Sequence, residues 1–119
     1  MEGFSLTPPS AAGGTWTYAV LHAFSEGSAL PIGGVVVGKG GVLYGTAAGG
    51  GASNAGTIYS LTPPSSPGGV WTETVLHSFV GSDGYAPSAT LTLTRDGVLY
   101  GTAPAGGSEG WGVVFAIRP

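Results

Sequence analysis

The feature that most constrains the fold of this 119-residue chain is an internal repeat. Residues 4–24 return, with substitutions, as residues 59–79, and the run G-V-L-Y-G-T-A at 41–47 returns at 97–103. Roughly 25 of about 55 aligned positions are identical, and one residue is inserted near Tyr85. A period of this length is typical of stacked or circular repeat folds, in which each unit buries its apolar face against the next. Residues shared by both copies are therefore interpreted first as scaffold, and residues that differ as candidates for function.

Short apolar segments separated by glycine and proline turn signals predict an all-β chain. The Asp96-Gly97 pair between two such segments predicts a tight hairpin in which both residues have positive φ. Strict alternation along the segment 70–79 predicts one face with Trp71, Glu73, Val75, His77 and Phe79. The expected strands cover residues 4–7, 15–24, 32–38, 42–47, 56–61, 70–79, 89–94, 98–103 and 113–117.

Four antiparallel strands per roughly 55 residues are typical of a β-propeller blade. We divide the chain into an N-terminal partial blade at 1–31 (strands 3 and 4), a complete blade at 32–86, and a C-terminal partial blade at 87–119 (strands 1 to 3). Two blades per chain do not close a ring of the four to eight that propellers use. We expect a homo-oligomer, most simply a trimer or tetramer completing a six- or eight-bladed ring, or else part of a longer repeat chain or a truncated, self-assembling fragment.

Composition argues against several other classes of protein. Charged residues make up 8% of the chain, with three basic against six acidic, so a nucleic-acid partner is not expected. No apolar run approaches the roughly 20 residues of a membrane span. Cysteine is absent, and the glycine tract at 49–51 lacks the Lys-Ser/Thr that ends a phosphate-binding loop, so no cofactor is predicted.

The order of motifs is similar to that of a kelch repeat, and it resembles the GloVer tandem repeat of choice-of-anchor bacterial proteins more closely. The residues that carry this resemblance are Leu99-Tyr100-Gly101-Thr102, Gly106-Gly107 and the segments 56–63, 71–79 and 81–84. The resemblance implies a secreted or surface-displayed repeat protein with many copies per chain and no assigned activity. This chain differs in holding two copies, and its first copy lacks the Asp-Gly of the segment 81–84.

The repeat also weakens the obvious chemical candidates. His22 and His77 occupy one equivalent position, which favours the same structural hydrogen bond in each copy over a catalytic base. A Ser78-His77-Asp83 triad is weaker, since neighbours in a strand point to opposite faces, and a metal site around Asp83 lacks further carboxylates. Trp16 and Trp71 begin equivalent strands and are expected in the core.

The residues that do not repeat fall on loops expected at one rim of the propeller, where such folds usually bind ligands. An exposed Trp and Tyr with nearby carboxylates would suit a glycan or a peptide, although Trp111 packing on its own loop is the alternative. The candidate binding residues are Asn54, Asp83, Tyr85, Glu109 and Trp111, with Glu26 beside them.

The expected function is a non-catalytic propeller module, a scaffold or a ligand-binding surface. The alternative is a propeller enzyme acting on carbohydrate, which would need paired acids near the axis. The segments expected to line that axis, 32–38 and 89–94, carry none.

Overall fold

The computed structural model describes residues 2–25 and 27–119 as three small antiparallel sheets that follow one another along the chain. The described residues contain no α-helix, so the expected all-β class is confirmed. The sheets pair in the orders β1-β2, β3-β4-β5-β6 and β7-β8-β9. Their strands are β1 Glu2–Thr7, β2 Thr17–Ala23, β3 Val36–Val37, β4 Leu43–Ala47, β5 Thr57–Thr62, β6 Thr72–Ser78, β7 Thr92–Leu93, β8 Leu99–Ala103 and β9 Val113–Ile117.

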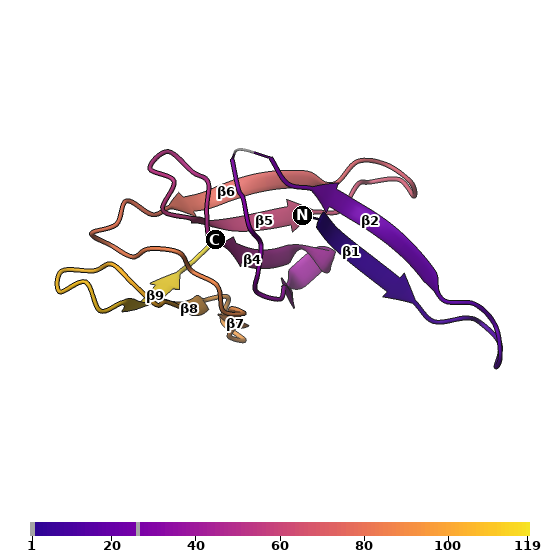
Figure 1. Cartoon of the computed structure of the whole chain (residues 1–119). Helices are drawn as coiled ribbons and strands as arrows, with labels where there is room; N and C mark the ends of the chain where they lie inside the picture. The colour runs from indigo at the N-terminus through magenta and orange to yellow at the C-terminus, as the bar shows by residue number, and fades with distance from the viewer. Residues whose placement is uncertain (1, 26) are drawn as a thin grey trace.

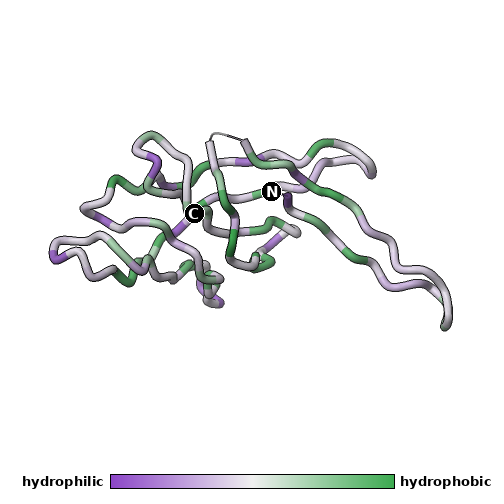
Figure 2. Tube along the Cα trace, in the orientation of Figure 1, coloured by the Kyte–Doolittle hydropathy of each residue, from purple (hydrophilic) through white to green (hydrophobic). Residues whose placement is uncertain are grey.

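The molecule is elongated, measuring 53 × 31 × 28 Å along its principal axes. The four-stranded sheet lies in the middle, the β1-β2 hairpin extends beyond one end of it, and the third sheet lies at the other end (Figure 1). Apolar stretches are spread along all three sheets rather than concentrated in one segment (Figure 2). A sheet of two to four short strands is too small to enclose a core alone, so each sheet packs against the next.

The repeat is preserved in strand register. In the second sheet Leu43 pairs with Leu61 and Gly45 with Tyr59. In the third sheet the equivalent pairs are Leu99 with Ile117 and Gly101 with Phe115. Because a shift of one residue would turn every side chain to the other face, this agreement means that both copies present the same faces.

Two apolar clusters join the sheets. One contains Ala55, Ile58, Phe79, Leu91 and Leu99, and it packs the second sheet against the third. The other contains Ala47, Tyr59 and Leu61, with Phe24 and Trp71 packed against it, and it joins the first sheet to the second. The core of this chain therefore lies between copies rather than inside one copy.

The strands expected at 32–38 and 89–94 are shorter than predicted, because only Val36–Val37 and Thr92–Leu93 pair in the sheets. The residues before them contact the neighbouring copy instead. The Gly34 N–H donates to Thr90 Oγ1 at 3.1 Å, and the Thr46 hydroxyl donates to the Ala89 carbonyl at 3.2 Å. The Gly34 N–H and the Ala89 carbonyl, which a longer ladder would have used, are thus bonded to side-chain hydroxyls of the neighbouring copy.

Two local predictions are also wrong. In the hairpin at Asp96-Gly97 only Gly97 has positive φ, because the loop has three residues and needs one left-handed residue. In β6 the ladder shifts between the pairs Ile58–His77 and Tyr59–Val75, which makes Leu76 an extra, bulged residue. Strict alternation therefore fails there, and Leu76 packs against the core.

The first sheet is the most exposed part of the chain. Phe4 is 59% exposed and Trp16 is 56% exposed, whereas Tyr59, the equivalent of Phe4, is 1% exposed. The prediction that Trp16 lies in the core is wrong, because the β1-β2 hairpin has no β3-β4 pair beside it. Trp71, which has such a pair, is partly buried.

Candidate functional site

The two histidines make the same aromatic contact in both copies. Each imidazole meets the phenyl ring two residues later edge to face. The ring centroids lie 4.9 Å apart for His22 and Phe24, and 4.8 Å apart for His77 and Phe79. This contact belongs to the scaffold of each copy.

Their hydrogen bonds differ, contrary to the expectation of one shared bond. His22 Nε2 lies 2.9 Å from Glu73 Oε1 and joins β2 to β6, whereas His77 Nε2 lies 2.7 Å from Asp83 Oδ2 in the loop after β6. Glu73 thus reaches His22 from the next sheet, whereas Asp83 reaches His77 from the same copy. Ser78 follows His77 directly in β6 and faces the opposite side, so the arrangement is not that of a triad.

Glu73 is a partly buried acid that the sequence reasoning missed. Its Oε1 meets His22, while its Oε2 is buried without a hydrogen-bond partner among the described residues. Burial, and after it the charge of Glu73, raises the pKa of Tyr59 to about 12. The Tyr59 hydroxyl therefore holds its proton more firmly than an exposed tyrosine does. Glu73 replaces Tyr18 at the equivalent position, and this difference between the copies could have identified it.

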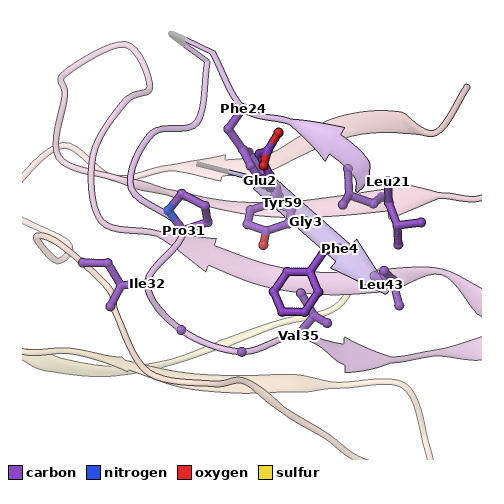
Figure 3. A pocket seen from close by; sticks show the side chains of 13 residues that line it. Glu2, Gly3, Phe4, Leu21, Phe24, Pro31, Ile32, Val35, Leu43 and Tyr59 are labelled. Carbon is purple, nitrogen blue, oxygen red and sulfur yellow. The ribbon is translucent and has the colours of Figure 1, made fainter. Parts of the chain in front are cut away.

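A cavity of about 340 Å³ lies between the β1-β2 hairpin, the segment 31–35 and strands β4 and β5. Side chains of the hairpin and of Tyr59, Val35 and Leu43 surround it (Figure 3). The lining is mostly apolar, with the Glu2 carboxylate and the Tyr59 hydroxyl as its polar side-chain groups. Its chemistry suits an apolar side chain or a small apolar molecule.

The structure brings together the loops that carry the predicted binding residues. These are the loops 48–56, 79–87 and 104–112. The Ala86 N–H donates to the Ala55 carbonyl at 2.8 Å, and the Tyr85 N–H donates to the Ala105 carbonyl at 2.9 Å. The Gly107 N–H donates to the Gly81 carbonyl at 3.0 Å. Asn54, Asp83, Tyr85, Glu109 and Trp111 therefore share one hydrogen-bonded group of loops, and Glu26 lies outside the described residues.

Two of these residues use their side chains to shape their own loops. Asn54 has φ 51°, and its Oδ1 accepts the Gly50 N–H at 2.8 Å. Asp83 Oδ1 accepts the Val80 N–H at 2.9 Å while Oδ2 meets His77, and these bonds, the Val80 bond most, lower the pKa of Asp83. Both side chains therefore have less freedom to bind a ligand.

The other three residues are exposed. Trp111 is 90% exposed, so it does not pack on its own loop, and Tyr85 is 48% exposed. Glu109 is exposed two residues before Trp111 in the same loop. These side chains are the ones that the loop group leaves available for a ligand.

Residues 2–25 and 27–119 contain no group of three or more His, Asp or Glu side chains that could hold a metal ion. In the same residues no helix has the length and apolarity that a membrane crossing needs.

Repeat, sheet order and shared register define the chain as an all-β tandem-repeat protein. The chain belongs to the Gloeobacter/Verrucomicrobia repeat family, whose family model matches residues 3–119. No curated protein and no solved structure matches it.

Proposed function

We propose that this chain is a non-catalytic β-propeller repeat module that acts at the cell exterior as a scaffold and ligand-binding surface. In this proposal the sheets of residues 1–31, 32–86 and 87–119 are blades or partial blades. Three or four copies complete a six- or eight-bladed ring. The proposed exterior location is supported by the resemblance to the GloVer repeat, which implies a secreted or surface-displayed protein.

The scaffold role is supported by what the repeated residues do. His22, Phe24, His77 and Phe79 contact one another, the adjacent sheets or their own loops, as scaffold residues do. The four-stranded order β3-β4-β5-β6 is the up-and-down order of a propeller blade, and the outer sheets are parts of that order.

The binding role rests on one observation, the group of three hydrogen-bonded loops from which Trp111 projects at 90% exposure. Trp111 is not shared by the two copies, and its side chain is not packed. Neither the repeat nor the core therefore accounts for a tryptophan at this position. Indole stacks on sugar rings and on peptide side chains, and the exposed Glu109 and Tyr85 of the same group of loops offer hydrogen bonds.

Binding can be tested on glycan and peptide arrays. We expect a ligand whose signal falls about tenfold with Trp111→Ala, as for the loss of roughly 1.4 kcal/mol. Val70→Ala is the matched control, because Val70 is 86% exposed and lies outside the three loops. The absence of any ligand, or equal signals from the wild type and Trp111→Ala, would remove the binding role.

A further inference from the structure

The strands β1, β5 and β9 occupy the same position in successive copies, yet they differ in their neighbours. β5 lies between β4 and β6, whereas in the described residues β1 pairs with β2 alone and β9 with β8 alone. In the repeat the place beside β9 belongs to a strand of the β6 type, and residues 2–25 and 27–119 put no strand there. The other strand of that type is β2, so each copy of the chain carries the neighbour that β9 lacks.

β9 is more apolar than β1 at equivalent positions. Val113 stands where β1 has Glu2, and Val114 stands where β1 has Gly3. Val114 is 79% exposed, while Ile58, its equivalent in β5, is 1% exposed. An exposed edge strand with such side chains is a template for pairing with another chain.

The cavity beside Gly3 has room for the side chain that β9 would bring. A Cβ added to Gly3 would lie 3.7 Å from Leu61 Cδ1 and 3.9 Å from Phe24 Cε2, which are ordinary contact distances. At the next junction between copies, Ile58 fills the equivalent place in the core. The cavity of about 340 Å³ thus lies where the other junction has a β-branched side chain, and Val114 is such a side chain.

A second hollow, of about 230 Å³, lies beside β9 itself and is bordered by His77, Asp83 and Phe115. At the first junction the equivalent histidine, His22, is met by Glu73 from β6. The residue of β2 equivalent to Glu73 is Tyr18, which is 57% exposed. A β2 strand placed beside β9 would bring Tyr18 to His77 and fill this hollow.

We propose that β9 of one chain pairs with β2 of a second copy and displaces that copy's β1. This inference rests on the proposed assembly of blades and specifies which two strands pair where one chain meets the next. The product is a four-stranded sheet in the order β7-β8-β9-β2, the equivalent of β3-β4-β5-β6. Since Phe4 pairs with Val20 and Ser5 with Ala19, the exchanged register pairs Phe115 with Val20 and Ala116 with Ala19.

The exchange replaces one backbone ladder with another, so the number of ladder hydrogen bonds changes little. The gain comes from burial of Val114 and Tyr18 and from covering the exposed edge of β9. The displaced strand gives up little packing, because Phe4 is already 59% exposed.

Disulfide trapping tests this register, because the sequence has no cysteine of its own. Ala116→Cys and Ala19→Cys are made in separate 119-residue chains, which are mixed and oxidised. Directly opposed residues of antiparallel strands have Cα atoms about 4.5 to 5.5 Å apart, within the range of a disulfide. We expect an intermolecular disulfide, and several-fold less when Thr17→Cys, two residues out of register, replaces Ala19→Cys.

Two further variants complete the design. Ser5→Cys with Ala19→Cys in one chain reports the unexchanged hairpin, and Gly3→Val, which fills the cavity from within the chain, should reduce intermolecular trapping. No disulfide, or equal trapping in the two registers, overturns the exchange. Native mass spectrometry of the same samples distinguishes failure of the strand exchange from failure of the closed ring. Copies that associate without the in-register disulfide overturn the exchange and leave the ring standing, whereas trapped dimers without closed rings support the exchange and remove the ring.

Discussion

At the scale of single residues, Gly45 and Gly101 show how the repeat motif is used in packing. Each faces an aromatic residue of the next strand, Tyr59 or Phe115. A Cβ on Gly45 would lie 2.5 Å from Tyr59 Oη, and a Cβ on Gly101 would lie 2.5 Å from Phe115 Cζ. Neither glycine has positive φ, so space rather than backbone conformation requires glycine here.

Gly45→Ala should therefore destabilise the protein by about 1 to 3 kcal/mol, because the buried Tyr59 ring has no room to move. Tyr59→Leu removes the clashing atoms and should cost less in the Gly45→Ala background than alone, with a coupling of at least about 0.5 kcal/mol. Urea unfolding of the four proteins of this cycle measures it. Gly27→Ala, which places a Cβ in open space, is the control. Additive effects of the two substitutions would show that the ring does not set the glycine requirement.

The candidate site was predictable from the sequence at this scale only in part. Comparing copies located the loops and Trp111, because Trp111 differs from its equivalent Ala55. It did not reveal that Asn54 and Asp83 use their side chains within their loops. The difference between Glu73 and its equivalent Tyr18 marked that position too, but the bond from Glu73 to His22 depends on how two copies pack. Residue type therefore shows that position 73 differs between the copies, but not which side chain it meets.

At the scale of elements, turn chemistry and apolar patterning predicted where the strands lie but not how each ends. The strand at 42–47 needed only its Leu-Tyr-Gly-Thr-Ala run, and β4 has nearly those bounds. The strand at 32–38 was overestimated, since Gly34 donates its N–H to Thr90 of the neighbouring copy. The bulge at Leu76 was missed because an extra residue in a ladder leaves no mark in a two-residue period.

The sheets should also differ in local stability. β5 is paired on both edges and is buried from Thr57 to Leu61, whereas the β1-β2 hairpin is a two-stranded unit with Phe4 and Tyr18 exposed. Two strands alone are marginally stable in water. In hydrogen exchange at low protein concentration, amides of β5 should be protected the most and those of β1 the least. Protection of β1 equal to that of β5 would contradict this order and would also argue against displacement of β1.

At the scale of the whole molecule, the distribution of the core decides how stability depends on concentration. Both apolar clusters lie between sheets, and apolar side chains of the first and third sheets such as Phe4 and Val114 remain exposed. In the proposed assembly a second copy covers these faces and binds only the folded chain, so association would add to the free energy of unfolding by mass action. The free energy of unfolding should therefore depend on the protein concentration as well as on the sequence.

The melting temperature of the 119-residue chain should rise with protein concentration. At a concentration of 100 times the dissociation constant the gain is about 2.7 kcal/mol, and each kcal/mol raises the Tm of a domain of this size by about 4 °C. Val114→Lys places a charge on the edge of β9 and should abolish the dependence, leaving the low-concentration Tm nearly unchanged because Val114 is 79% exposed. Val70→Lys, at an 86% exposed position away from β9, should leave the dependence intact. Differential scanning calorimetry over a hundredfold range of concentration would measure all three proteins. A wild-type Tm that is constant over this range, with a single monomeric species in sedimentation, would mean that the open faces are stable in water without a second copy.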